Sequence, residues 1–157
     1  MSDPDNYPVP TRLDHLPSFL LTQSAMRVHR VVFDRLDAAG ARGHHYRMLS
    51  ALDEFGPSSQ VELGRRCGLD RSDVVACIDA LADRMYVRRA SDPKDRRRNI
   101  VSLTRKGRDR LAELERVLTA VQDEAFAPLD THEREQLVAM LTKIIDHHVH
   151  LASERRP

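Results

Sequence analysis

The fold is decided by residues 56–107, which read GPSSQVELGRRCGLDRSDVVACIDALADRMYVRRASDPKDRRRNIVSLTRKG. Two helix starts are marked there by a capping residue with an acid three positions later, Ser59 with Glu62 and Asp70 with Asp73. Gly68 lies between them and suits a tight turn. A short helix over residues 60–67 and a second one that ends near Arg84, joined by a glycine turn, predict a helix-turn-helix.

The residues that follow predict a β-hairpin. Residues 86–89 and 99–103 suit two strands, and the Asp-Pro pair at 92–93 marks residues 90–98 as the loop between them. A helix-turn-helix followed by a hairpin is a winged helix, so the predicted fold class is mainly α with a small β-hairpin wing. Arg96, Arg97 and Arg98 would lie at the tip of this hairpin, where they cannot belong to a core.

The wing arginines suggest a ligand that carries negative charge. Phosphates or a narrow minor groove would relieve their mutual repulsion. Asp95 is placed to pair with one arginine and hold its guanidinium in one orientation. The alternative is an exposed loop that charge keeps soluble.

The charge of the chain is unevenly distributed. The net charge is +1 over 157 residues, but residues 84–110 hold eleven basic residues against three aspartates, a local charge of +8. The rest of the chain is therefore about −7. A basic segment in an otherwise acidic protein favours a polyanionic partner without making the whole molecule a nonspecific polycation.

Long helices are predicted on both sides of this lobe. Residues 1–14 hold three prolines and are expected to form a flexible N-terminal arm. A helix over 17–39 is expected to stop at Gly40 and Gly43, and further helices are expected over 44–55, from Thr104 to about 126, and from Asp130 onward. The helix over 17–39 carries two apolar stripes, which implies two packing partners. We therefore assign 15–43 and 104–157 to a helical dimerisation region and 44–103 to the winged helix-turn-helix lobe, the alternative being a monomeric bundle.

Several classes of protein are disfavoured by the sequence. No apolar run approaches the roughly 20 residues that span a bilayer, and residues 1–12 are polar and proline-rich, unlike a signal peptide. Cys67 and Cys77 are too few for a disulfide framework and fit a reducing compartment, so we expect a cytoplasmic protein with no membrane partner. No phosphate-binding loop, metalloprotease motif or nucleophile elbow is present, so the chain is not expected to be an enzyme or to hold a cofactor.

Residues 56–107 resemble the DNA-binding lobe of the MarR family of transcription regulators. The most specific part is the D-x-R wing, Asp95 and Arg97, followed by V-x-L-T-x-x-G at Val101, Leu103, Thr104 and Gly107. The resemblance implies an obligate homodimer on a pseudo-palindromic operator in double-stranded DNA. It also implies a repressor that a small aromatic or anionic ligand releases from DNA.

Roles on DNA can be assigned to particular residues. The second helix would enter the major groove, and its candidate contact residues are Asp70, Arg71, Ser72 and Val75. The wing candidates are Asp95, Arg96, Arg97 and Arg98, with Arg97 in the minor groove, and the phosphate candidates are Ser59, Gln60, Arg105 and Lys106. Val75 and Ala76 depart from the polar or basic residues usual in the family, which would give the wing a larger share of the contacts.

The resemblance to the family also implies a ligand pocket, located between the dimerisation helices and the winged-helix lobe. The candidate lining residues are His29, Arg30, His44, His45 and Met48. The two adjacent histidines could hold a carboxylate or a phenolate. The alternative for this pair is a solvent-facing helix start.

Three alternatives to a ligand-controlled DNA regulator stay open. His147, His148 and His150 could bind zinc, but their spacing places no full ligand set on one helical face, so no metal site is predicted. Cys67 and Cys77 could sense oxidants, although both occupy positions where an inward leucine would serve. A winged helix that binds another protein is the third, but it would have no need of three adjacent arginines.

Overall fold

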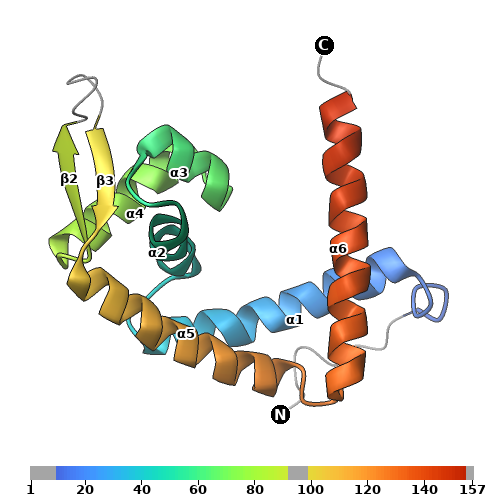
Figure 1. Cartoon of the computed structure of the whole chain (residues 1–157). Coiled ribbons are helices and arrows are strands. Elements are labelled where there is room, and N and C mark those ends of the chain that lie inside the picture. The colour runs from blue at the N-terminus through green and yellow to red at the C-terminus, as the bar shows by residue number, and fades with distance from the viewer. Residues whose placement is uncertain (1–9, 92–98, 155–157) are drawn as a thin grey trace. The chain divides into compact units, whose positions relative to one another are not determined.

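The computed structural model describes residues 10–91 and 99–154 of the chain (Figure 1). It divides into two compact units, residues 1–121 and 122–157. The elements of the first unit, the last of which continues into the second, are α1 (Pro17–Ala38), α2 (Gly43–Phe55), β1 (Ser58–Ser59), α3 (Gln60–Cys67), α4 (Arg71–Asp83), β2 (Val87–Ser91), β3 (Asn99–Leu103) and α5 (Arg105–Ala125). The second unit holds α6 (Thr131–Glu154).

The helix-turn-helix forms as predicted, because both helix starts are capped. At α3 the Ser59 N–H donates to Glu62 Oε2 (2.7 Å) and the Glu62 N–H donates back to Ser59 Oγ (3.3 Å). Gly68 ends α3 in the left-handed conformation, with a φ of 62° that favours glycine. At α4 the Asp73 N–H donates to Asp70 Oδ1 (2.9 Å).

The hairpin is part of a three-stranded antiparallel sheet with the order β1-β3-β2. Figure 1 shows β2 and β3 as adjacent arrows beside the group formed by α2, α3 and α4. Strand β1 was not predicted, because its two serines have no apolar alternation. It pairs with the middle of β3, Ser58 with Val101 and Ser59 with Ile100.

The loop of the hairpin begins later than predicted. Ala90 and Ser91 belong to β2, where they pair with Ile100 and Asn99 of β3. Cross-strand pairing therefore extends the wing by two residues that the sequence pattern had assigned to the loop. The remaining loop residues, 92–98, lie outside the described part of the chain.

The start of α5 is fixed against the end of the helix-turn-helix. Thr104 caps the helix, because its Oγ1 accepts from the Gly107 N–H (3.0 Å) and donates to the Met85 carbonyl (2.7 Å). A Cβ at Gly107 would lie 2.1 Å from the Tyr86 carbonyl oxygen. Only glycine fits this close approach of two backbone segments.

The core of the first unit is shared by α2, the helix-turn-helix, the sheet and parts of α1 and α5. It comprises Leu36, Ala41, Met48, Leu49, Ala51, Leu52, Leu63, Cys67, Val74, Cys77, Ile78, Leu81, Val87, Val101, Leu111 and Leu114. Both cysteines are buried in it, as predicted. Apolar residues from all five helices, α1 to α5, thus pack with Val87 and Val101 of the sheet in one core that holds α4 in place.

The turn between α1 and α2 is held by two arginines from distant parts of the chain. Gly40 has a φ of 66° and follows the end of α1, as predicted, but Gly43 is the first residue of α2 and does not end α1. Arg84, at the end of α4, donates to the Gly40 carbonyl (3.1 Å). Arg110 of α5 donates to the Ala39 carbonyl.

Helix α6, in the second unit, begins with the predicted cap. The Asp130 N–H donates to Glu133 Oε2 and the Glu133 N–H donates to Asp130 Oδ1, both at 2.9 Å. Large apolar side chains of α6 are exposed in the single chain, namely Val138, Met140, Ile144, Ile145 and Val149. Over the described residues, none of the helices combines the length and apolar content needed to cross a bilayer.

Candidate nucleic-acid interface and ligand cavity

Helix α4 buries one face and exposes the other. Val74, Cys77, Ile78 and Leu81 are buried in the core. The exposed face near the start of the helix lines one open depression of about 730 Å³, formed by Asp70, Arg71, Ser72, Val75, Ala76 and Asp79. The four residues predicted to contact bases therefore lie together on the outer face of the second helix.

Within this set, Asp70 and Ser72 also form the helix cap. Ser72 Oγ donates to Asp70 Oδ1 (2.7 Å), beside the bond from the Asp73 N–H. The hydrogen bond from the Asp73 backbone, and next the one from the Ser72 hydroxyl, lower the pKa of the Asp70 carboxyl. The cap fixes where α4 begins, and Arg71, its first residue, is exposed directly beside it.

Wing strand β2 is linked to the exposed face of α4 by an ion pair, and to β3 by a side-chain hydrogen bond. Arg89 of β2 forms an ion pair with Asp79 of α4. Arg88, next to it on β2, donates from Nε to Ser102 Oγ on β3 (3.4 Å). The predicted wing-tip residues Asp95, Arg96, Arg97 and Arg98 lie outside the described residues, and their roles stay predictions.

The four residues predicted to contact phosphates differ in how exposed their side chains are. Ser59 is 6% exposed, and both its N–H and its hydroxyl are bonded to Glu62, so its side chain is not available to a phosphate. Gln60 is half-buried in the first turn of α3. Arg105 and Lys106 are exposed at the start of α5, with the Lys106 ammonium 5.3 Å from the centre of the Tyr86 ring.

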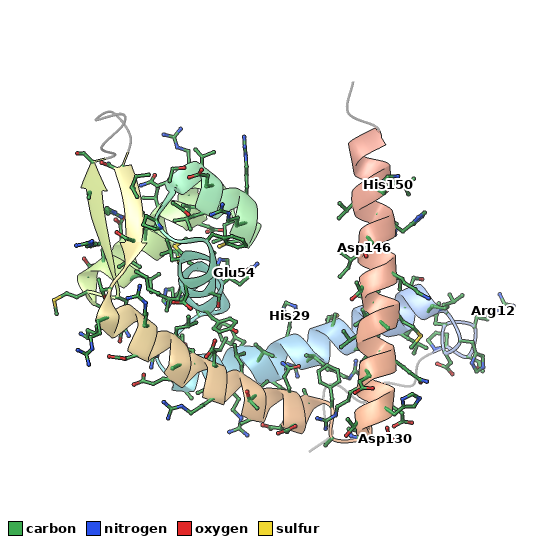
Figure 2. All side chains as sticks on the ribbon, in the orientation of Figure 1. Arg12, His29, Glu54, Asp130, Asp146 and His150 are labelled. Atoms are coloured by element: carbon green, nitrogen blue, oxygen red, sulfur yellow. The ribbon has the colours of Figure 1, made fainter. Side chains whose placement is uncertain are left out.

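The five residues predicted to line a ligand pocket lie in different settings. Met48 is fully buried in the core, because α2 turns this residue toward α3 and α4, and it cannot contact a ligand. His29 and Arg30 are exposed on α1, and Figure 2 shows His29 projecting from that helix. Of the five predicted residues, His44 and His45 line a cavity whose lining includes none of the other three.

This cavity lies between the α1–α2 turn and α4, and we call it the turn cavity. Its volume is about 490 Å³, and its lining comprises Asp37, Gly40, Ala41, Arg42, His44, His45, Asp73, Ala76, Cys77, Ala80 and Arg84. The volume is within the roughly 300–1,000 Å³ typical of small-molecule sites. Arg42 and Arg84 were not predicted, because their approach to the histidines depends on how α4 packs against the turn.

His45 is held in a defined orientation at the turn cavity. The Arg42 N–H donates to His45 Nδ1 (3.3 Å), which makes Nδ1 the acceptor and places the proton of the neutral ring on Nε2. Burial, and then the positive charge of Arg42, Arg84, His44 and Arg110, lowers the pKa of His45 below its ordinary value of 6.5. The ring is therefore neutral at pH 7 in a positive local potential.

The two thiols and the histidines offer no evident sensor chemistry. Burial raises the pKa of Cys67, and burial with the nearby Cys67 raises the pKa of Cys77 to about 12. Because both pKa values are raised, neither thiol is a reactive thiolate at neutral pH. Among the described residues, no group of three or more His, Cys, Asp or Glu side chains is arranged to hold a metal ion.

Comparison with known proteins assigns this arrangement to a family. The MarR family model matches residues 40–98, which run from the α1–α2 turn to the residue before β3. The structure of a probable transcriptional regulator from Pseudomonas aeruginosa is 31% identical, with 85% of this chain and 99% of that chain covered and a TM-score of 0.75. The chain belongs to the MarR family. This membership confirms the predicted winged-helix fold class and the prediction of a transcription regulator rather than an enzyme.

Two further MarR-family relatives are informative. The HTH-type transcriptional repressor NicR of Pseudomonas putida is 33% identical over 98 residues, which is 62% of each chain, so this chain spans less than two thirds of that relative. A structure that describes the regulation of DNA binding of Bordetella bronchiseptica BpsR by 6-hydroxynicotinic acid is 25% identical. It covers 88% of this chain and 99% of that one, with a TM-score of 0.76.

Proposed function

We propose that this MarR-family regulator is a homodimeric, sequence-specific DNA-binding repressor that a small aromatic or anionic ligand releases from its operator. The observation that carries the proposal is the exposed outer face of α4, where Arg71 lies beside a capped helix start. An arginine at the start of a recognition helix can donate two hydrogen bonds to a guanine in the major groove. Val75, on the same face, suits contact with a thymine methyl group.

The basic residues around this face support a DNA partner over a protein partner. Arg88 and Arg105 are exposed on β2 and at the start of α5, and the sequence adds three arginines, Arg96 to Arg98, which are predicted to lie at the wing tip. Contacts from such residues to phosphates supply most of the sequence-independent affinity for DNA. A winged helix that binds another protein does not need this concentration of positive charge.

The dimer is supported by apolar surface that the single chain leaves exposed. Met26 and Phe33 of α1 are 60% and 61% exposed, and Ile145 and Val149 of α6 are 60% and 65% exposed. Faces of this kind are typically buried in the interface of an obligate dimer. We expect sedimentation equilibrium to give a dimer that Ile145→Glu dissociates, while Lys143→Glu on the same helix leaves it intact. A monomeric wild-type protein would contradict this part of the proposal.

The repressor and ligand assignments rest on the relatives. NicR is a transcriptional repressor, and 6-hydroxynicotinic acid regulates DNA binding by BpsR. A DNA regulator of this kind would act in the cytoplasm, which stays a prediction.

The test is a footprint on the DNA immediately upstream of the gene for this protein. A dimer with one α4 in each half-site should protect two segments whose centres are about 10 base pairs apart, or a multiple of that spacing. Protection of a single half-site would contradict the dimeric arrangement. No protection there or in a genome-wide selection of bound DNA would contradict the DNA-binding role.

A further inference from the structure

Helix α1 is attached to the winged-helix lobe near its C-terminal end. Leu36 of α1 is buried in the core, and Ala39 packs against that core. The Ala41 N–H donates to the Leu36 carbonyl (2.8 Å). The Gly40 N–H donates to the Asp37 carbonyl at the same distance of 2.8 Å. These two bonds form a Schellman motif with Gly40 in the left-handed conformation, so the direction in which the chain leaves α1 is set at this turn.

Two arginines from other helices bind carbonyl groups of this turn. Arg84, the C-cap residue of α4, donates to the Gly40 carbonyl (3.1 Å), and Arg110 of α5 donates to the Ala39 carbonyl. The Arg110 side chain is 15% exposed, and it also forms an ion pair with Glu113 (2.9 Å), which holds its guanidinium in place. Carbonyl groups at the end of a helix lack partners within the helix and carry its negative dipole end, so they favour cationic donors. The end of α1 is thereby bonded to both α4 and α5.

The Arg84 contact lies at the opposite end of α4 from Arg71, which is proposed to contact bases. Helix α4 has 13 residues and is therefore about 20 Å long. A rotation of about 10° about its Arg84 end would move its Arg71 end by about 3–4 Å, which is close to the rise of one base pair. A small change at the turn therefore changes which base pairs α4 meets.

We propose that Arg84 and Arg110 are positioning residues that set the orientation of α4 relative to α1, and thereby the half-site spacing that the dimer accepts. The inference rests on the proposed function, because it requires a dimer that binds two half-sites through α4. It separates two parts of specificity. Arg71 and Val75 select bases within a half-site, whereas the two arginines at the turn select the distance between half-sites. In a symmetric dimer a change of orientation occurs in both copies, so its effect on that distance is doubled.

The test is binding of the full-length protein to a series of DNA duplexes that carry the two half-sites located by footprinting. The spacing between the half-sites is kept, or made one or two base pairs longer or shorter. Each added base pair moves one half-site by about 3.4 Å and rotates it by about 35° around the DNA axis. The wild type should bind the original spacing at least about tenfold more tightly than a spacing changed by one base pair.

Arg84→Gln and Arg110→Gln should each reduce this ratio of affinities to about threefold or less, or move the preferred spacing. The ratio is the informative quantity, because the loss of one positive charge weakens binding to all duplexes alike and leaves the ratio unchanged. The same preferred spacing and the same ratio in the wild type and in both glutamine variants would overturn the inference.

Two control variants accompany this series. Arg84→Lys keeps a positively charged donor at the end of α4, so it should retain more of the spacing preference than Arg84→Gln. Arg116 of α5 donates to the Ala112 carbonyl of its own helix (3.3 Å). Arg116→Gln therefore removes a charge without changing the turn, and its spacing preference should match that of the wild type. Urea denaturation shows that each variant is folded.

A distance measurement without DNA separates this inference from the proposed function. Val61 of α3 is 64% exposed, so a spin label on Val61→Cys reports the distance between the two lobes of a dimer in pulsed electron resonance. Adding Arg84→Gln should shift or broaden this distance by about 3 Å or more. A change of this kind in a protein that does not bind DNA specifically would support the positioning of the lobe and overturn the repressor role. Specific DNA binding with an unchanged distance and an unchanged spacing preference would overturn the inference alone.

Discussion

Asp79 on the exposed face of α4 forms an ion pair with Arg89 on wing strand β2. The pair joins the two elements that are proposed to contact DNA, and it holds one basic residue of the wing on an acid of the recognition helix. Both side chains are partly exposed, at 52% for Asp79 and 36% for Arg89. The contribution of the pair to stability is therefore small, at most about 1 kcal/mol, and we predict a larger effect on DNA binding.

Asp79→Asn should tighten binding to random-sequence DNA, because it removes a negative charge from the DNA-facing surface and releases Arg89 toward phosphate. One additional phosphate contact makes the dependence of log K on log salt concentration steeper by about 0.9. Asp83→Asn, at the end of the same helix, makes an equal change of charge without touching this pair. The same salt dependence in both variants would show that the pair has no role in DNA binding.

Gly107→Ala should lower the free energy of unfolding by about 1–3 kcal/mol, because its Cβ would overlap the Tyr86 carbonyl oxygen and force the start of α5 away from the hairpin. Gly43→Ala is the matched control. A Cβ there meets nothing within 4 Å in the first turn of α2, so this change should be neutral or stabilise by up to about 1 kcal/mol. Urea denaturation measures both, and equal effects would contradict the close contact at Gly107.

Protonation of His45 should make the fold less stable in mild acid. Well above pH 6.5 the ring is neutral in both folded and unfolded chains and contributes no pH dependence. As the pH falls below 6.5, the unfolded chain takes up the proton first, so the free energy of unfolding decreases until the lowered pKa of the folded state is reached. The charged and titratable groups beside the ring or in the same lining are Arg42, Arg84, Arg110, His44, Asp37 and Asp73.

The measurement is the free energy of unfolding from pH 8 to pH 5 for the wild type and for His45→Gln. Glutamine can still accept the Arg42 N–H, so the start of α2 is preserved. The decrease toward low pH should be smaller in the variant. An identical decrease in both proteins would show that the acid sensitivity comes from other groups.

The thiols should be slow to react in the folded protein. Cys67 and Cys77 are 3% and 5% exposed, and the pKa of Cys77 is raised to about 12. Reaction with a disulfide reagent at pH 8 should be at least about a hundredfold slower than in urea, and peroxide should leave DNA affinity unchanged. A rapid reaction that abolishes DNA binding would favour the redox-responsive alternative.

The local parts of the fold were predictable because they depend on neighbours in the sequence. The capping boxes at Ser59 and Asp130 and the turn at Gly68 are set within three or four residues, and the structure confirms all of them. Strand β1 was not predictable from the sequence, because its two serines show no apolar alternation. They form a strand only because β3 lies beside them and pairs with them.

The lining of the turn cavity was predictable only in part, because its residues come from distant parts of the sequence. His44 and His45 were found from the sequence as an adjacent pair. Met48, one turn along the same helix, was assigned to the pocket and lies in the core. Arg84 donates to the carbonyl of Gly40, which lies 44 residues earlier in the chain and also lines the turn cavity. No spacing in the sequence signals that approach.

The most direct test of the central claim is fluorescence anisotropy of the purified protein with DNA from upstream of its own gene, against scrambled DNA of the same composition, at several salt concentrations. We expect tight, salt-sensitive binding that prefers the upstream DNA. Arg71→Ala should reduce this preference by about 1–3 kcal/mol, Arg97→Ala should weaken binding to both DNAs, and Arg116→Ala on α5 should match the wild type. Equal, weak binding of the wild-type protein to both DNAs, unaffected by Arg71→Ala, would contradict the account.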